Sequence, residues 1–443
     1  MRAQAKTSPA TSGEALTHTP AVTLAAMLRD GQISACELMT ACLERIAACE
    51  PQIRAWAFLD PDNAIGQARL ADRRRAEGLP LGPLHGLPVG VKDVFDSFDM
   101  PSEYGSETLR GRRPTRDADA VALLRQAGAI IAGKTTTSEF GMYHPSTTRN
   151  PYDVYRSPGV SSAGSAAAVV AAMVPLALGT QHTASSTLPA SFCGAFAFKP
   201  SFGFTSMTGS NVLVPRLAHV GFLARSSADL RLFAGAYHPP LSGAPFDDDR
   251  PPRLGVVRGA AWPAVDAGVR AAFDAFIATL PTTVAAVALP DEFDRAVEVA
   301  FDLLNAHLAF RFGSEPDETR HRYCRALQDG IAAGRAISAT KYLADNASAD
   351  RLAELASGLF DGHDALMTLS APTEALRLEQ GPGSGILSTP WSLCGLPTVS
   401  LPLLKGPQGL PVGVQLIGRR GGDDALLRAA EWLENASAAR TDP

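Results

Sequence analysis

The stretch that decides the fold runs from residue 157 to residue 203 and reads SPGVSSAGSAAAVVAAMVPLALGTQHTASSTLPASFCGAFAFKPSFG. It opens with a Gly/Ser-rich loop (residues 157–165), after which an alanine-rich run predicts a helix over residues 166–173. Short apolar runs at residues 174–178 and 194–198 predict two strands, and a hydroxyl-rich turn lies between them. Helix and short apolar strand therefore alternate, which is typical of an α/β protein.

The same alternation continues on both sides of this stretch. Toward the N-terminus, a short buried strand at residues 88–91 delivers Lys92 at its end, and a helix at 118–127 and a strand at 129–132 follow. Toward the C-terminus we expect a strand at 254–257, helices around 261–279 and 294–311, and strands at 398–401 and 412–418 joined by a turn at 406–409. We predict one α/β domain over residues 21–443, with a large twisted, mixed central sheet covered by helices on both faces. The Pro-, Gly- and Asp-rich residues 235–253 are the best candidate for a break in it.

The N-terminal region divides into a tail and a helix. Residues 1–20 are polar and lack the apolar core of a signal peptide, so we expect a disordered tail there. Ser34 and Glu37 have capping-box spacing, which predicts a helix from there to about Cys49, ended by Pro51.

Bulk composition excludes several function classes. The 443 residues are 46% hydrophobic and 19% charged, which suits a globular protein, and the net charge of −5 argues against nucleic acid as a partner. The longest apolar run, residues 166–178, is too short to span a membrane. The six cysteines have neither CxxC nor metal-ligand spacing, so we expect reduced thiols in a cytoplasmic protein with no metal and no cofactor.

Two segments carry residues suited to chemistry. The loop at residues 157–165 presents hydroxyl and backbone N–H groups at a helix N-terminus, although a flexible N-capping turn has the same composition. It lacks the Gly-Lys-Ser/Thr ending of a phosphate-binding loop, so nucleotide binding is discounted. The turn at residues 180–187 holds five hydroxyl-bearing residues between apolar segments, which indicates either catalysis or a turn that bonds its own backbone.

Together these segments resemble the amidase-signature family, and the resemblance covers about residues 24–433. The matching motifs are Gly90–Asp93, Arg149–Pro151, Gly164–Ser165 with the alanine-rich helix, Pro175–Thr180, Pro189–Gly194, Lys199–Gly203, Trp391–Pro397 and Gly409–Gly413. In that family a lysine, a serine in a cis peptide and a nucleophilic serine act together. By motif position they correspond to Lys92, Ser161 and Ser185.

The resemblance implies an amidase that works through an acyl-enzyme and needs no cofactor. A buried, neutral Lys92 would take a proton from Ser161, which takes one from Ser185 as Ser185 attacks an amide carbonyl. Backbone N–H groups of residues 182–185, those of His182, Thr183 and Ala184 among them, would hold the oxyanion. The expected partner is a small-molecule amide, with no nucleic acid and no membrane, and a homodimer is left open.

The sequence departs from the family pattern around the nucleophile. Thr183 and Ala184 stand where the family has two glycines, and either would be strained if its φ had to be positive. Thr187 and Leu188 stand where an arginine is usual, Val160 and Ala163 replace glycines, and His182 replaces a small residue. Three explanations compete: an amidase with an altered pocket and an unusual substrate, an acyl transferase or amide-forming enzyme, and a catalytically impaired binding or complex subunit. The transamidating subunit that completes aminoacyl-tRNA is a weaker alternative.

The substrate pocket should be closed by residues near 205–220 and 300–345. The second segment has an apolar character through Phe301, Leu304, Phe310 and Phe312, which core packing explains equally well.

Overall fold

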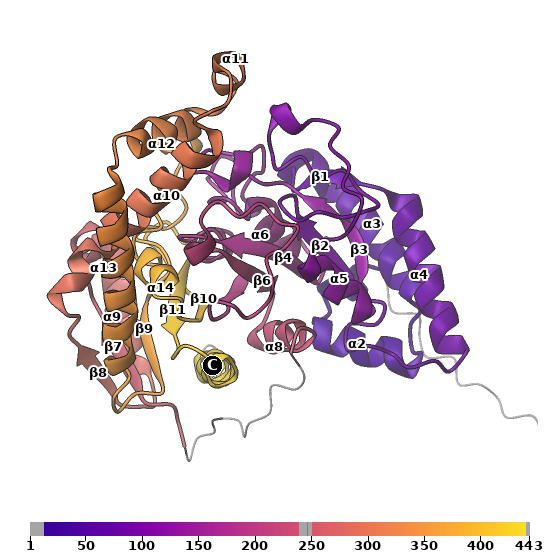
Figure 1. The fold of residues 1–443 in the computed structure, drawn as a ribbon. Coiled ribbons are helices and arrows are strands. Elements are labelled where there is room, and N and C mark those ends of the chain that lie inside the picture. The colour runs from indigo at the N-terminus through magenta and orange to yellow at the C-terminus, as the bar shows by residue number, and fades with distance from the viewer. Residues whose placement is uncertain (1–12, 239–245, 247–249, 440–443) are drawn as a thin grey trace, which may run out of the picture.

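The computed structural model describes residues 13–238, 246 and 250–439, and one continuous sheet organises them (Figure 1). The sheet has 11 strands in the order β1-β3-β2-β4-β6-β5-β10-β11-β9-β7-β8. Their bounds are β1 Trp56–Leu59, β2 Pro88–Lys92, β3 Ile130–Thr135, β4 Leu176–Gln181, β5 Phe196–Lys199, β6 His219–Ala224, β7 Leu254–Val257, β8 Val284–Val287, β9 Ala365–Leu369, β10 Thr398–Lys405 and β11 Pro411–Ile417. β2 is parallel to β3 and β4, and β7 is parallel to β8 and β9, whereas the other neighbours are antiparallel. The predicted α/β fold with a mixed central sheet is confirmed.

The helices are α1 Gly13–His18, α2 Ala21–Asp30, α3 Ala35–Ile53, α4 Pro61–Ala76, α5 Asp119–Gln126, α6 Ala163–Val170, α7 Thr187–Cys193, α8 Ser227–Gly235, α9 Ala267–Thr279, α10 Ala296–Phe312, α11 Asp317–Arg320, α12 Arg325–Arg335, α13 Ala339–Gly358, α14 Thr389–Leu393 and α15 Asp423–Ala438. In Figure 1 the indigo and purple N-terminal elements lie at one end of the sheet, and the orange elements beyond residue 250 lie at the other.

Helices cover both faces of the sheet because successive strand residues alternate between two cores. Ala177, Ala197 and Leu223 pack with alanines of α6 and α7 in one cluster. Their neighbours along the strands, such as Leu178 and Phe222, belong to the larger core that includes α8 and α15. The small side chains on the first face let α6 and α7 lie close to the centre of the sheet.

Two N-terminal predictions are wrong. Residues 13–18 of the expected tail form α1, which is held because Leu16 is 4% exposed and α1 packs on α3; residues 1–12 lie outside the described part. Pro51 does not end α3, although the capping box of Ser34 and Glu37 is present. The helix runs two residues further and ends where Arg54, at φ 54°, donates its N–H to Glu50 O at 3.0 Å.

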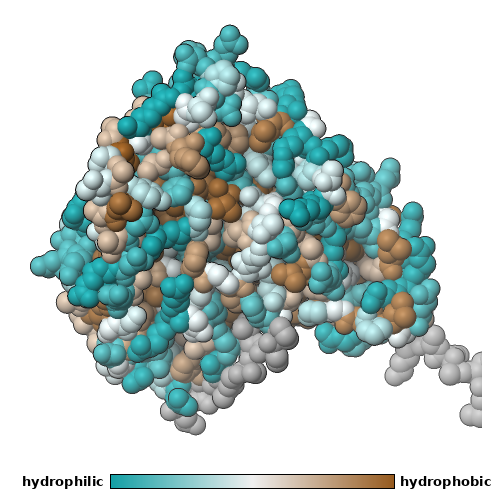
Figure 2. Space-filling view, viewed as in Figure 1, coloured by the Kyte–Doolittle hydropathy of each residue, from teal (hydrophilic) through white to brown (hydrophobic). Residues whose placement is uncertain are grey.

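The expected break at residues 235–253 does not divide the sheet, because β6 precedes it and β7 follows it. Residues 239–245 and 247–249 of that segment lie outside the described part. The turn at 406–409 is confirmed, with Gly409 N donating to Gly406 O at 2.9 Å. On the face shown in Figure 2, hydrophobic residues are interspersed with hydrophilic ones. Among the described helices, none has the length and apolar character needed to cross a membrane.

Candidate active site

Lys92 lies at the centre of the candidate site. It ends β2, which is parallel to β4, so the carboxyl ends of the two strands meet at one edge of the sheet. Its side chain is 0% exposed, and Nζ lies 2.6 Å from Ser161 Oγ, 2.8 Å from Thr180 Oγ1 and 3.1 Å from Ser162 Oγ. Burial lowers the pKa of Lys92 well below its ordinary value, because the charged form loses its hydration.

The hydrogen bonds around Nζ are made with three hydroxyl groups, and Nζ is the donor to each of them. The Ser162 hydroxyl donates to Thr180 O at 3.2 Å, so it can only accept from Lys92. The contact with Ser161 is the shortest of the three, and rotation of that hydroxyl would let it donate to the lone pair of a neutral Lys92. This arrangement allows Lys92 to act as a base toward Ser161.

Ser161 is held in a loop that packs directly on α7. The Val160–Ser161 peptide bond is cis, as the resemblance implied. Gly159 has φ +80°, and a Cβ at this position would lie 2.8 Å from Pro189 Cα, so only glycine fits the close approach. Ser162 N then donates to Ser185 O at 3.0 Å, which ties the loop to the turn that carries Ser185.

Ser185 lies in the turn between β4 and α7, at 6% exposure. Within the described residues its Oγ has no hydrogen-bond partner, and no hydrogen bond joins it to Ser161 Oγ. The backbone N–H groups of Thr183, Ala184 and Ser185 likewise donate to no acceptor in the part of the chain described. Free donors beside a free hydroxyl are what acyl transfer through a tetrahedral oxyanion requires.

The backbone of this turn is not strained by its non-glycine residues. Neither Thr183 nor Ala184 has a positive φ, so the left-handed conformation considered from the sequence does not occur. Room for the Ala184 methyl comes from Gly385, where a Cβ would lie 2.3 Å from Ala184 Cβ. Replacing the two glycines by Thr183 and Ala184 therefore adds side-chain atoms to the turn without forcing its backbone into the left-handed region.

Both segments expected to close the pocket contact residues near the nucleophile. Leu213 N donates to His182 Nε2 at 3.2 Å, and burial, followed by the nearby Lys92, lowers the pKa of His182 to about 3. His182 is therefore neutral, and the proton is on Nδ1 because Nε2 accepts. Phe301 of α10 packs on the ring of Tyr143, with ring centroids 6.1 Å apart, and Thr183 Oγ1 donates to Tyr143 Oη at 3.4 Å.

Sequence reasoning assigned no role to four residues of the site, which are Tyr143, Thr180, Gln181 and Ser392. Thr180 and Gln181 could have been found, since they end a strand beside the one that ends at Lys92. Tyr143 and Ser392 reach the turn from distant parts of the chain. Ser392 lies in the matched motif Trp391–Pro397, which was given no role at the site, and nothing local in the sequence marks Tyr143.

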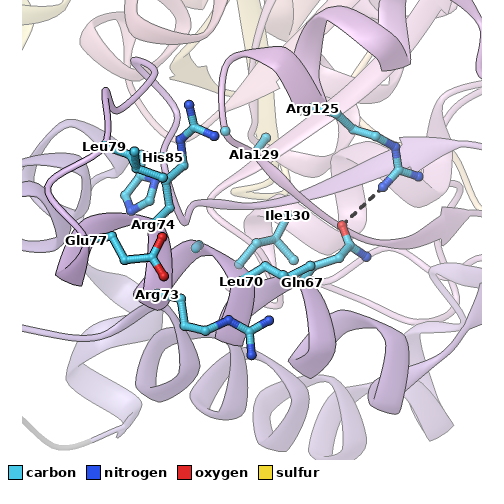
Figure 3. Close-up of a pocket in the computed structure, with 12 residues that line it drawn as sticks. Gln67, Leu70, Arg73, Arg74, Glu77, Leu79, His85, Arg125, Ala129 and Ile130 are labelled. Atoms are coloured by element: carbon cyan, nitrogen blue, oxygen red, sulfur yellow. Dashed lines mark hydrogen bonds between the residues drawn. The ribbon is translucent and has the colours of Figure 1, made fainter.

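A separate pocket of about 400 Å³ lies away from these residues, between the end of α4 and the start of β3 (Figure 3). Its lining includes Arg73, Arg74, His85 and Arg125, and the last of these donates to Gln67 Oε1 at 3.3 Å. None of the predicted site residues lines it.

Comparisons with known proteins agree with this geometry. The sequence model of a family described as Amidase matches residues 37–427. The chain is 34% identical to a glutamyl-tRNA(Gln) amidotransferase subunit from Acidothermus cellulolyticus, over 95% of each chain. It resembles a solved amidase with a TM-score of 0.86 at 30% identity, covering 94% of this chain and 99% of that one. Peptide amidase from Stenotrophomonas maltophilia gives a TM-score of 0.80 at 27% identity, covering 96% and 98%.

Proposed function

Since the chain belongs to the Amidase family of hydrolases that act on C–N bonds, we propose that it cleaves an amide through an acyl-enzyme on Ser185. Lys92 accepts the proton of Ser161, and Ser161 accepts the proton of Ser185 as Ser185 Oγ attacks the carbonyl carbon. The N–H groups of residues 182–185, those of His182, Thr183 and Ala184 included, stabilise the oxyanion. The relayed proton leaves with the amine, and water repeats the sequence to release the acid.

One observation carries this proposal. The fully buried Lys92 has its Nζ 2.6 Å from Ser161 Oγ, and the loop that carries Ser161 is hydrogen-bonded to the Ser185 backbone. The relay needs Ser185 Oγ to form a hydrogen bond with Ser161 Oγ when the substrate binds. Such contacts commonly tighten only in the substrate complex, so their absence without substrate is compatible with the mechanism.

A fluorophosphonate probe tests the proposal, because it phosphonylates an activated serine and needs no knowledge of the substrate. We expect peptide mass analysis to find the label on Ser185, and Ser185→Ala to remove it. Activity on a panel of amides then measures turnover. A wild-type protein that is never labelled and turns over no amide or ester would instead support the binding or complex subunit.

We propose that the substrate pocket is narrower beside the nucleophile than a turn with two glycines would leave it. The side chain of Thr183 lies beside the nucleophile and is joined to the Tyr143 hydroxyl, whereas the methyl of Ala184 packs in a core cluster with Leu188 and Phe192. We therefore expect the preferred substrate to be an amide with a compact group next to its carbonyl, where it would contact Thr183. Turnover that increases in Thr183→Gly for bulkier amides would support this, and an unchanged preference would contradict it.

A second candidate is acyl transfer to an amine, which the 34% identity to an amidotransferase subunit favours. The same acyl-enzyme serves both reactions, and they differ in whether water or an amine attacks it. Adding amines to the amide panel and measuring new amide product separates them. Release of acid alone, at every amine concentration, would identify a hydrolase.

A further inference from the structure

The side chain of Gln181 is the best-connected polar group beneath the nucleophile turn. Gln181 ends β4 and is 0% exposed. Its Oε1 accepts from Ser186 N at 3.0 Å and from Thr187 N at 3.1 Å. Its Nε2 donates to Thr183 O at 3.2 Å and to Ser392 Oγ at 3.0 Å. One amide therefore bonds the backbone on both sides of Ser185.

The bond to Thr183 O fixes the direction of a neighbouring N–H group. Thr183 O and Ala184 N belong to the same planar, trans peptide unit, so the Ala184 N–H points opposite to the Thr183 carbonyl. Ser392 Oγ, from α14, also donates to Thr183 O, at 2.8 Å. Two buried donors thus hold this carbonyl toward Gln181 and Ser392, and the Ala184 N–H faces the other way, without an acceptor among the described residues.

We infer that Gln181 is a positioning residue that, with Ser392, orients the Ala184 N–H toward the oxyanion. The inference rests on the proposed acyl-enzyme at Ser185 and adds how its oxyanion donors are held. A primary amide meets the demand, because the group accepts two N–H bonds and donates two, to Thr183 O and to Ser392 Oγ. A carboxylate at position 181 would keep the two accepted bonds, but it would lose the donation and repel Thr183 O.

The test compares the rate of fluorophosphonate labelling at Ser185 in Gln181→Glu, Gln181→Met and Ser392→Ala. Removing one oxyanion donor typically slows catalysis by about 10²–10³-fold, so we expect the labelling rate of Gln181→Met to be about 10²-fold below that of the wild type. Ser392→Ala removes one of the two donors to Thr183 O and should give a smaller fall. Because both side chains hold the same carbonyl, the fall in the double variant should differ from the product of the single falls.

A matched control is Gln415→Met in β11. Gln415 is also a 0% exposed strand glutamine, and its Nε2 donates to Leu369 O at 3.4 Å, outside the nucleophile turn. We expect its labelling rate to equal that of the wild type. On any amide that the wild type turns over, Gln181→Met should lower kcat, expressed per mole of enzyme that circular dichroism shows to be folded, and leave KM nearly unchanged.

Failure of the proposed function and failure of the Gln181 role give different results. A wild-type protein that is not labelled at Ser185 overturns the proposed function itself. If the wild type is labelled at Ser185 and both Gln181→Met and Gln181→Glu are labelled at the wild-type rate, only the role of Gln181 is overturned. If both position-181 variants fail to fold, Ser392→Ala decides, and an unchanged rate in that variant contradicts the inference.

Discussion

Replacing Lys92 by methionine removes the base while keeping a side chain of similar length. General-base catalysis contributes about 10²–10⁴-fold, so we expect labelling of Ser185 by a fluorophosphonate to slow by that factor. The pH dependence should change as well. Burial lowers the pKa of Lys92, and only its neutral form accepts a proton, so the wild-type rate should rise with pH through that pKa and then level off. The variant should lack this rise.

The expected cost in stability follows from the contacts that Lys92 makes. Without its amine, the hydroxyls of Ser161 and Thr180 lose the partner that they have in the structure. A buried hydroxyl without a partner costs about 1–3 kcal/mol, which gives about 2–6 kcal/mol for the two. The variant no longer has to bury the amine of Lys92, and the desolvation penalty that this removes offsets part of the cost. Ser162 keeps its bonds to the Thr180 backbone, so the loop should stay in place.

The assay measures labelling rate from pH 5 to 10 together with urea unfolding, and Lys199→Met serves as the control. Lys199 is likewise 0% exposed, but its Nζ donates to the backbone of Pro200 and Leu396. We expect the control to keep the wild-type rate and pH profile. Labelling of Lys92→Met at the wild-type rate, while the variant is folded, would refute the assignment of Lys92 as the base.

Four further predictions concern Ser161, Ser162, Lys199 and Gly385. Ser161→Ala should slow labelling at least about 10²-fold, because it interrupts the relay. Ser162→Ala should keep most labelling and lose about 1–3 kcal/mol in urea unfolding, because its hydroxyl bonds the strand backbone. Burial lowers the pKa of Lys199 to about 7, below the unfolded value of about 10.4, so the folded state binds fewer protons between these values and stability rises with pH there. That rise, about 1.4 kcal/mol per pH unit, should be absent in Lys199→Met when urea unfolding is compared at pH 7 and pH 10. Gly385→Ala adds a methyl 2.3 Å from Ala184 Cβ and should cost about 1–3 kcal/mol, and Ala184→Gly in the same chain should recover part of it in both unfolding and labelling.

Local sequence signals predicted the parts of the fold that depend on local interactions. The capping box at Ser34 was found because both partners lie within one turn of helix. The strand that ends at Lys92 was found because apolar residues bounded by Gly and Pro mark short buried strands. The end of α3 was misplaced, since the bond from Arg54 to Glu50 carries the helix past Pro51. Helix α1 was missed because its stability comes from packing on α3, which six residues cannot reveal.

The nucleophile turn shows most clearly why sequence stops short of the site. The loss of two glycines at Thr183 and Ala184 suggested backbone strain, a question that only the observed φ values could answer. Hydrogen bonds from Gln181 and from Ser392, about two hundred residues away in sequence, hold the turn in place. Gly385 leaves room for the Ala184 methyl. The contacts with Ser392 and Gly385 are not local, so no window of sequence around the nucleophile contains them. A glycine lost beside a nucleophile therefore says little about activity until the residue facing its new side chain is known, and here that residue is itself a glycine.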